Sequence, residues 1–393
     1  MQVNWQTKKL GDLGEYINGR VFAKSEWGTK GLPIIRIQNL NNENTGFNYC
    51  NSNIENRYHI NKGDILISWS ASLDIYVWER EEALLNQHIF KVILNEEIIY
   101  KKYFIYLIKT KLDEMASKTH GATMKHIVRS KFLHIEIKLP SLKIQKEIVA
   151  KLDEKFAKLR EVKRLREEVL TDTEKILSQT LHEIFKEGKK KGWEEKKIGD
   201  IAIQIRSGFA CGKQNEVPAG IVHLRTHNIS LDGQLNLDKI VRIPKSFVDT
   251  EIFTLKQDDL IFNNTNSVEL VGKTILITED LPYAFSNHLT RIRFDEKQII
   301  PSWVLYVFQK YWIDKVFERM CTRWIGQAGI NQTSLSSIKI LVPPLPEQQK
   351  IVKKLDALSE KVRQAVELQK VQLEDLEKLE KAYLREAFNG GMI

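Results

Sequence analysis

Leu139-Pro-Ser-Leu-Lys-Ile-Gln-Lys-Glu-Ile-Val-Ala-Lys-Leu-Asp153 decides the fold, because the chain contains this stretch twice. The second copy is Val342-Pro-Pro-Leu-Pro-Glu-Gln-Gln-Lys-Ile-Val-Lys-Lys-Leu-Asp356. In both copies an apolar run ends at a proline and leads into charged and apolar residues at helical spacing. Because an internal repeat marks a structural unit, we expect two modules, each followed by a long helix.

Shorter blocks repeat in the same order upstream of these two stretches. The spacing between matching blocks differs between the halves, which indicates one scaffold with loops of different length. A duplication that only stabilises a pseudo-dimer with one shared function is the alternative interpretation. The matching blocks are Trp5 to Asp12 with Trp193 to Asp200, Ile34 to Leu40 with Ile221 to Ile229, Gly63 to Ile67 with Asp258 to Phe262, Asn86 to Ile89 with Ser286 to Leu289 and, loosely, Asn18-Gly-Arg20 with Arg206-Ser-Gly208.

Both halves predict the same order of elements. Short buried strands that end in polar loops come first, then an amphipathic helix (Tyr103 to Ala116; Trp303 to Met320), then a strand that ends at a proline (Ile135 to Leu139; Ile338 to Val342). The predicted fold class is α+β, with two similar domains joined by two long antiparallel helices that form an intramolecular coiled coil with pseudo-two-fold symmetry. The predicted segments are module 1 at 1–140, a central helix at 141–188, module 2 at 189–343 and a distal helix at 344–393.

The two long helices carry apolar residues at the three-and-four spacing of a coiled-coil seam. Forty-odd helical residues extend about 60 to 70 Å at 1.5 Å per residue, so a small module cannot cover a whole stripe. We expect the helices to pack on each other, with ordinary coiled-coil dimerisation as the alternative. Gly188 with the basic run Lys189-Lys190-Lys191-Gly192 is predicted to end the first helix, and Asn389-Gly390-Gly391 to end the second. The seam residues are Val149, Leu152, Phe156, Leu159, Leu355, Leu358, Val362 and Val366.

The composition favours a polyanionic partner inside the cell. The net charge is +9, the pI is near 9.1, and the three cysteines form no Cys-x-x-Cys pair. Widely spaced cysteines argue against a zinc site and against a disulfide framework. Free thiols, apolar runs too short to span a bilayer, and no recognisable signal peptide predict a cytoplasmic protein with no membrane contact.

No catalytic motif stands out in the sequence. Val271-Gly-Lys-Thr274 resembles the end of a phosphate-binding loop, but the glycine that this motif requires is replaced by Ser267. Glycine fingerprints for dinucleotides or methyl donors, adenine-methyltransferase signatures and His-Glu-x-x-His are absent. His88 and His288 hold matching positions in the repeat, which favours a structural role. We therefore expect neither a catalytic site nor a metal site.

Polar residues recur at matching places in the two halves and are the candidates for DNA contacts. Amides, hydroxyls and guanidinium groups suit hydrogen bonding to base edges and phosphates, and glycines permit close backbone approach. The candidates are Arg20, Arg36, Gln38, Asn39, Ser68, Trp69, Ser70, Ser72, Gly121 and Thr123 in the first half, and Arg206, Arg225, His227, Asn228, Asn263, Asn264, Thr265, Asn266, Gly326 and Gln327 in the second.

These blocks resemble a known family. Ile65-Leu-Ile-Ser-Trp-Ser-Ala-Ser72 with Leu85-Asn-Gln-His-Ile-Phe90 is similar to the target recognition domain of type I restriction–modification specificity subunits. Asp259-Leu-Ile-Phe-Asn-Asn-Thr-Asn-Ser267 with Ala284-Phe-Ser-Asn-His288 shows the same likeness, and Pro344-Leu-Pro-Glu-Gln-Gln349 resembles the family's helix start. The resemblance extends over essentially the whole chain.

The resemblance implies a non-catalytic subunit that reads a bipartite, asymmetric DNA sequence. Each recognition domain would read one half-site, and the helices would set the spacer and dock two methyltransferase subunits. Restriction–translocase subunits would complete the complex, with S-adenosylmethionine and ATP bound by partner subunits and no cofactor in this chain. The alternatives are a coiled-coil scaffold, or a DNA methyltransferase or nuclease with an unrecognised active site.

Overall fold

The computed structural model describes residues 5–42, 44–70, 72–118, 129–231, 233–389 and 391, and gives only the backbone for 72 and 116–118. Contacts within the chain divide it into two compact units. Unit 1 comprises Met1–Glu167 and Val371–Ile393, and unit 2 comprises Glu168–Lys370. Each unit therefore takes one part of each long helix, whereas the sequence segments treated the helices as separate pieces.

Unit 1 contains two four-stranded sheets and a strand pair. The first sheet is antiparallel and the second contains one parallel pair, β3 with β8. The first has the order β2 (Gly14–Asn18), β9 (Ile89–Leu94), β6 (Ile65–Ser70), β7 (Ser72–Val77), the second β4 (Asn48–Cys50), β3 (Leu32–Ile35), β8 (Ala83–Leu85), β5 (His59–Ile60), and β1 (Gln6–Lys9) pairs with β10 (Glu136–Leu139). The short helices are α1 (Ile37–Asn41) and α3 (Arg129–Leu133), and the longer α2 (Lys101–Lys118) lies against β7.

Unit 2 repeats this arrangement, which confirms the predicted duplication. Its parallel pair, β13 with β18, corresponds to β3 with β8. The strands are β12 (Ala202–Ser207), β19 (Leu289–Phe294), β15 (Leu260–Asn263) and β17 (Thr274–Leu276) in one sheet, β14 (Arg242–Ile243), β13 (Ile221–Leu224) and β18 (Ala284–Phe285) in the next, β16 (Thr265–Asn266), β21 (Gln327–Gly329) and β20 (Thr322–Trp324) in the third, and the pair β11 (Glu194–Lys197) with β22 (Lys339–Val342). The helices are α5 (Ile198–Ile201), α6 (Thr250–Phe253), α7 (Pro301–Ile313), α8 (Val316–Met320) and α9 (Gln332–Ser336).

Aromatic side chains form the centre of each core. In unit 1 the ring of Phe90 packs against Phe132, and in unit 2 the rings of Phe262, Phe308 and Phe317 contact one another edge-on. All of these rings are essentially buried. Burial of one such side chain contributes about 1.5 to 3 kcal/mol, so each unit has a core of its own.

The two long helices are present and begin at matching positions. They are α4 (Leu142–Lys190) and α10 (Leu345–Phe388). The first helix ends at Lys190, within the predicted end segment from Gly188 to Gly192, and Gly188 itself lies inside α4. A Cβ atom on Gly188 would lie 2.1 Å from the Trp193 ring. The absence of a side chain at this helical position therefore allows the indole to pack directly against the helix backbone.

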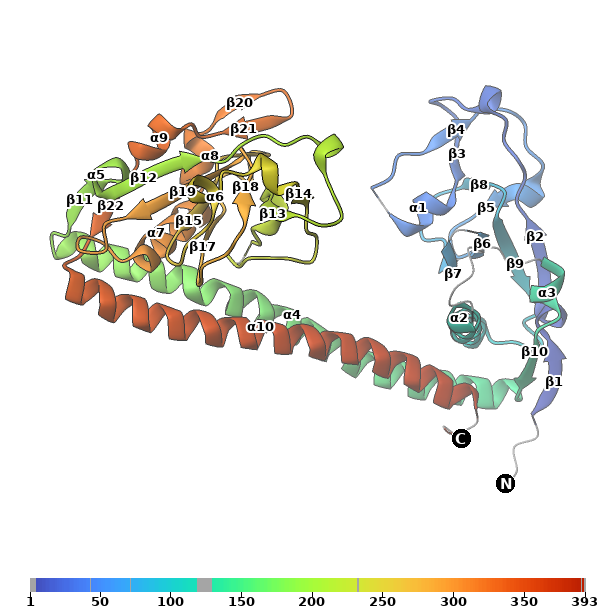
Figure 1. The fold of residues 1–393 in the computed structure, drawn as a ribbon. Coiled ribbons are helices and arrows are strands. Elements are labelled where there is room, and N and C mark those ends of the chain that lie inside the picture. The colour runs from blue at the N-terminus through green and yellow to red at the C-terminus, as the bar shows by residue number, and fades with distance from the viewer. Residues whose placement is uncertain are drawn as a thin grey trace. The chain divides into compact units, whose positions relative to one another are not determined.

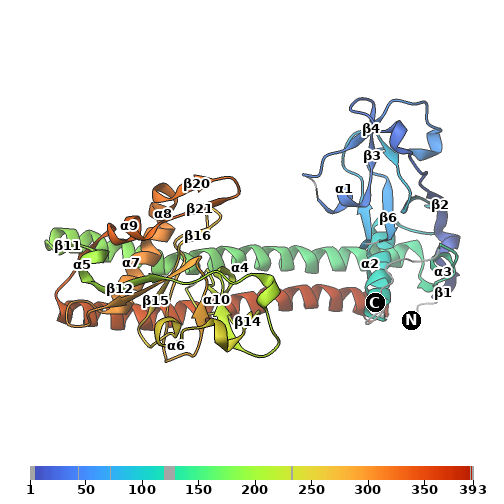
Figure 2. The same cartoon turned by 45° about the horizontal axis from the view of Figure 1, so that its top comes forward.

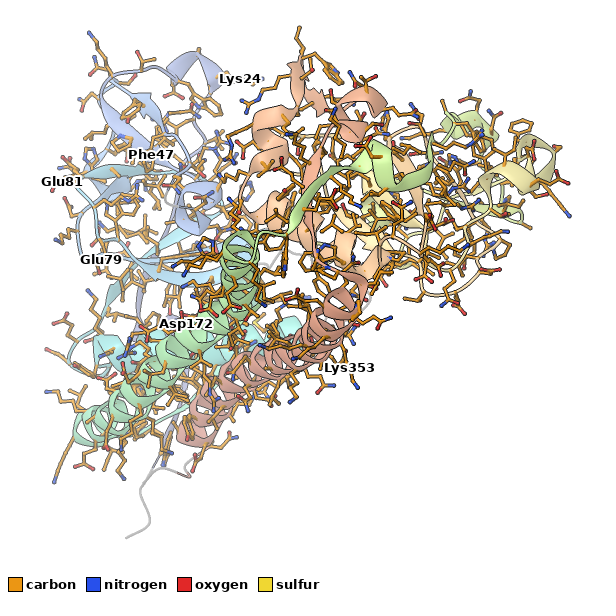
Figure 3. All side chains as sticks on the ribbon, turned by 90° about the vertical axis from the view of Figure 1, so that its left-hand side faces the viewer. Lys24, Phe47, Glu79, Glu81, Asp172 and Lys353 are labelled. Carbon is orange, nitrogen blue, oxygen red and sulfur yellow. The ribbon has the colours of Figure 1, made fainter. Side chains whose placement is uncertain are left out.

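The helices pack side by side in antiparallel fashion (Figures 1 and 2). Within unit 1, Lys155 lies 3.4 Å from Glu386 and Lys163 lies 3.2 Å from Glu377. These pairings run in opposite directions along the two helices. The packed pair confirms the predicted fold class. Outer helix faces carry charged side chains, such as Asp172 on α4 and Lys353 on α10 (Figure 3).

The predicted seam residues differ in burial. Those near the helix ends join the core of the adjacent unit, whereas those further along are half-buried. Buried are Val149, Leu152, Phe156 and Leu355, and half-buried are Leu159, Leu358, Val362 and Val366. In unit 1 the Phe156 ring also packs edge-on against the Tyr106 ring of α2, with 5.3 Å between the ring centroids. The helix ends are therefore anchored on the modules as well as on each other.

Among the described residues, no helix is long and apolar enough to cross a bilayer. The same residues contain no group of three or more His, Cys, Asp or Glu side chains arranged to hold a metal ion.

Candidate nucleic-acid interface

A polar turn follows strand β3 in unit 1 and strand β13 in unit 2, and both turns are built alike. The Asn39 Oδ1 atom accepts a hydrogen bond from the Arg36 backbone N–H at 3.1 Å, and Asn228 Oδ1 accepts one from the Arg225 N–H at 2.8 Å. Each Nδ2 group donates to two backbone carbonyls further along the chain. Both asparagines are buried, so their amides fix the turn from inside.

The neighbours of these asparagines remain accessible. Gln38 and His227 are exposed, and Arg36 and Arg225 are half-buried. Arg36 donates to the Gln38 side chain at 2.8 Å, whereas Arg225 donates to the Cys211 carbonyl at 2.8 Å. The two turns thus share a backbone framework but display different groups.

A second pair of matching segments lies at the ends of β6 and β15. The Trp69 N–H donates to the His88 carbonyl at 3.1 Å, and the Asn264 N–H donates to the His288 carbonyl at 3.0 Å. This equivalence confirms the repeat placement of both histidines. The prediction of polar loops is wrong here, since Ser68, Trp69 and Ser70 belong to β6. These residues pair with β7, and Ser68 pairs with β9 as well.

Several polar candidates in these strand ends are buried. Asn264 donates to the Thr290 hydroxyl at 2.8 Å and to the Asn287 carbonyl, and Asn263 donates to the Leu270 carbonyl at 3.1 Å. The Ser68 hydroxyl accepts from a backbone N–H of β7. The buried members are Ser68, Ser70, Asn263 and Asn264, whereas Trp69, Thr265 and Asn266 are half-buried.

Strand β16 brings two predicted loops of unit 2 together. Thr265 pairs with Gly329 and Asn266 with Ala328, so β16 forms one sheet with the hairpin β20–β21. This hairpin carries Gly326 and Gln327, both of which are exposed. The sequence placed these segments in separate loops and gave no sign of their contact.

The two arginine candidates near the start of each module do not correspond. The Gly19 N–H donates to Ile89 and the Gly208 N–H donates to Leu289, which makes these glycines equivalent. Arg20 then matches Phe209, and Arg206 lies elsewhere, on β12. Arg20 forms an ion pair with Glu26 at 2.6 Å. The loose alignment of Asn18-Gly-Arg20 with Arg206-Ser-Gly208 is therefore shifted.

The side chains of three predicted DNA contacts are not among those that the structure describes. Gly121 and Thr123 lie outside the described residues, and of Ser72 only the backbone in β7 is described. All three stay predictions.

Lys273 of the Val-Gly-Lys-Thr stretch is buried beneath the turn that contains His227. Its ammonium group donates to the carbonyls of Thr226 and Ile229. Burial lowers the pKa of this lysine. The lysine supports the turn from below.

An ion pair, missed in the sequence, joins the residue before β15 to β19 in unit 2 and the residue before β6 to β9 in unit 1. Asp259 receives two hydrogen bonds from the Arg293 guanidinium, at 2.6 and 3.1 Å, and Asp64 pairs with Lys91 at 2.8 Å. Arg291 is also buried beside Asp259, and this burial lowers its pKa to about 10. Charges buried as deeply as Asp259 and Arg291 are stable only when paired, so the pair of unit 2 stabilises the sheet and does not face a ligand.

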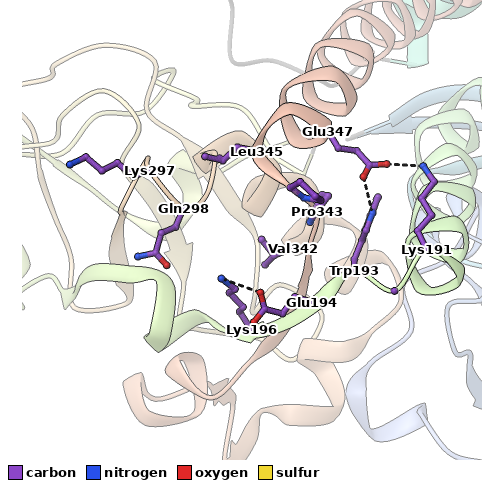
Figure 4. A pocket seen from close by; sticks show the side chains of 12 residues that line it. Lys191, Trp193, Glu194, Lys196, Lys297, Gln298, Val342, Pro343, Leu345 and Glu347 are labelled. Atoms are coloured by element: carbon purple, nitrogen blue, oxygen red, sulfur yellow. Dashed lines mark hydrogen bonds and ion pairs between the residues drawn. The ribbon is translucent and has the colours of Figure 1, made fainter.

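A cavity of about 540 Å³ lies where α4 ends and α10 begins (Figure 4). Glu347 accepts hydrogen bonds there from Lys191 at 2.7 Å and from Trp193 Nε1 at 3.1 Å. The pKa of Glu347 is lowered, first by the hydrogen bond from Lys191. Ile144 occupies the position of Glu347 in the first copy of the repeat, so unit 1 has no carboxylate there to accept equivalent hydrogen bonds. Both long helices nevertheless start at matching residues.

The accessible candidates offer amide, imidazole and guanidinium groups beside glycines. Such groups donate and accept hydrogen bonds with bases and phosphates. Two domains of one design on paired helices, each with such groups accessible, form the arrangement expected of a sequence-reading protein.

Comparison with known proteins shows the family to which this chain belongs. The family model described as type I restriction modification DNA specificity domain matches residues 2–171 and 190–377, and the chain belongs to this family. It is accordingly the DNA specificity subunit of a type I restriction–modification system, which is a non-catalytic subunit.

Individual relatives are distant in sequence. The chain is 22% identical over 382 residues to the EcoBI specificity subunit of Escherichia coli, a match that covers 90% of this chain and 79% of that protein. It is 25% identical over 363 residues to the EcoKI specificity subunit of E. coli strain K12, covering 83% and 75%.

Two solved structures share the fold. One belongs to a study of complex assembly and conformational transition of the type I R-M system, with a TM-score of 0.71, 19% identity and full coverage of both chains. The other is the HsdS subunit from Thermoanaerobacter tengcongensis, with a TM-score of 0.51, 20% identity and coverage of 98% and 97%.

Proposed function

We propose that this chain reads a bipartite, asymmetric DNA target, with unit 1 on one half-site and unit 2 on the other. One observation carries the proposal: equivalent turns present Gln38 in unit 1 and His227 in unit 2 on the same backbone framework. An amide and an imidazole prefer different base edges. Two readers of one design with different exposed groups would select different half-sites.

The DNA-contacting set that we propose consists of the accessible candidates. These are Arg20, Arg36, Gln38 and Trp69 in unit 1, and Arg206, Arg225, His227, Thr265, Asn266, Gly326 and Gln327 in unit 2. Ser72, Gly121 and Thr123 stay in the set as sequence-based predictions. The buried asparagines and serines leave it, because their polar groups lie inside the domains and shape the reading surface.

We also propose that the paired helices set the spacer and dock two methyltransferase subunits. Support comes from apolar residues on α4 that remain accessible: Val162, Leu165, Val169 and Ile176 are 40 to 45% exposed. They follow the three-four-seven spacing of a helical seam. A partner helix laid along this ridge would bury it.

The finished assembly would include restriction–translocase subunits and double-stranded DNA. In this proposal S-adenosylmethionine and ATP belong to the partner subunits, and this chain contributes sequence recognition. The similar solved structure from the study of complex assembly of the type I R-M system supports the proposal that this chain works within a multi-subunit complex.

The test is to express the chain with its methyltransferase subunit and map methylated adenines in genomic DNA. We expect one bipartite motif with unequal halves. His227→Ala with Asn266→Ala should relax base selection in one half-site and leave the other intact. Gln38→Ala, the matched change in unit 1, should affect the opposite half. Equal relaxation of both halves by either variant would contradict separate reading.

A further inference from the structure

The hairpin β20–β21 lies at the edge of unit 2 (Figures 1 and 2), and the residues at its tip are apolar and exposed. Ile325 is 102% exposed and Trp324 is 50% exposed. Large apolar side chains at the end of a projecting turn contribute nothing to a core. Apolar surface exposed to water in this way is unfavourable, and it often marks a site that a partner covers.

The tip is held in a defined conformation. Arg323 pairs with Ala328 and Trp324 with Gln327 across the hairpin, and Gly326 closes the turn at a φ of 77°. Strand β21 is bonded in turn to β16. The hairpin therefore supplies two of the three strands of one small sheet.

Gly329 fixes the direction of the indole. A Cβ atom at this position would lie 2.8 Å from Cη2 of Trp324 and 3.0 Å from the Asn264 carbonyl oxygen. Trp324 therefore rests on bare backbone across the hairpin, and half of its surface stays in solvent. A ring held in this way loses little further conformational freedom on binding.

The charges beside the tip suit a phosphate backbone. Arg319 is exposed, and the side chains of Arg323 and Lys315 are 60% and 71% exposed. Glu318, with carboxylate oxygens 3.7 to 3.8 Å from Lys315 and Arg323, and the exposed Glu269 offset part of this charge. On the other side the same small sheet carries Asn266, one of the proposed DNA contacts.

We infer that Ile325, backed by Trp324, is a wedge that enters the DNA duplex at one base step beside the half-site read by unit 2. Apolar side chains inserted between base pairs unstack that step and kink the duplex, and nearby cations hold the phosphates. An aromatic ring behind the wedge stacks on the exposed base face. This inference rests on the proposed function and adds a deformation step to it.

The test uses the full chain with its methyltransferase subunit and duplexes that carry 2-aminopurine at successive positions of the target. We expect one position beside the unit 2 half-site to brighten on binding, because unstacking relieves quenching. Ile325→Ser and Trp324→Ala should abolish that signal and weaken binding about tenfold, the size of one lost stacking contact. Trp324→Phe should restore it in part.

Leu231→Ser is the matched control, because Leu231 is 65% exposed in the same unit and lies outside the hairpin. It should leave the signal unchanged. Absence of any brightened position with the unaltered chain would overturn the inference. So would loss of methyltransferase co-purification in the hairpin variants, since the tip would then be a protein contact. A bipartite methylation motif obtained without unstacking would reject the wedge and retain the proposed function.

Discussion

The side-chain amides of Gln145 and Gln348 make matching hydrogen bonds at the starts of the two long helices. Each Oε1 atom accepts a backbone N–H, from Tyr100 at 2.7 Å and from Ile300 at 2.8 Å. Each Nε2 group donates to the carbonyl of the proline five residues earlier. Both side chains are fully buried. One buried amide thus ties helix, strand end and module together in each unit.

Gln348→Leu should destabilise unit 2, because the buried Ile300 N–H and two carbonyls lose their partner. An unsatisfied buried group costs about 1 to 3 kcal/mol, so the free energy of unfolding should fall by about that amount in a urea titration. Gln364→Leu is the control, since Gln364 is exposed on the same helix. An equal effect of the two changes would show that the buried bonds contribute nothing.

Gly188→Ala should destabilise the protein although alanine is the better helix former. In an open helix interior the change stabilises by about 1 kcal/mol. Here the added methyl group would overlap the Trp193 ring, and such overpacking costs about 1 to 3 kcal/mol. Thermal unfolding should reveal a lower midpoint. Lys186→Ala, on an exposed face of α4, should not lower it; a midpoint raised by Gly188→Ala would contradict the packing argument.

His223→Ile should flatten the acid dependence of stability. Burial lowers the pKa of His223 to about 4, and the charge of Arg225 acts in the same direction. The unfolded chain takes up a proton below about pH 6.5 that the folded chain does not. Stability is therefore complete above pH 6.5 and falls by about 3 kcal/mol as the pH drops to 4.

Isoleucine is chosen as the replacement for His223, because Ile34 holds the equivalent strand position in unit 1 and cannot titrate. Urea titrations at pH 7 and pH 5 should differ less for the variant than for the parent. An unchanged difference would mean that His223 is not the titrating group.

Seven residues inserted in both helices, after Glu167 and after Lys370, should change the tolerated DNA spacer. A heptad preserves the seam and lengthens each helix by about 10 Å, which corresponds to about three base pairs of duplex. Methylation mapping should return a longer spacer or no methylation. An unchanged spacer would show that the helices do not measure it.

The sequence alone predicted the framework well. The repeat, the strand before each helix and the start of both helices follow from local signals such as Pro140 and Pro343, and the structure confirms them. The first helix ends within the predicted segment from Gly188 to Gly192, but the position of Gly188 inside α4 could not be predicted, because its contact with Trp193 is visible only in three dimensions.

The candidate site was less predictable. Asn39, Asn228, Asn263 and Asn264 belong to polar blocks that suggest solvent, yet each amide bonds within its domain. Pattern alone does not distinguish an amide that reads a ligand from one that shapes a turn. At the tip of the β20–β21 hairpin the sequence pointed to Gly326 and Gln327 but not to Ile325, because an apolar residue is expected in a core.

The turns anchored by Asn39 and Asn228 have a consequence for how new specificities arise. Each turn holds its shape mainly through a buried amide, while the exposed residue beside it makes one hydrogen bond of its own, Gln38 with Arg36 and His227 with the Lys239 carbonyl. Other polar residues could replace Gln38 and His227 while the buried amide keeps the backbone of the turn. Under the proposed function, one such exchange would change the DNA sequence selected by one unit and leave the assembly intact.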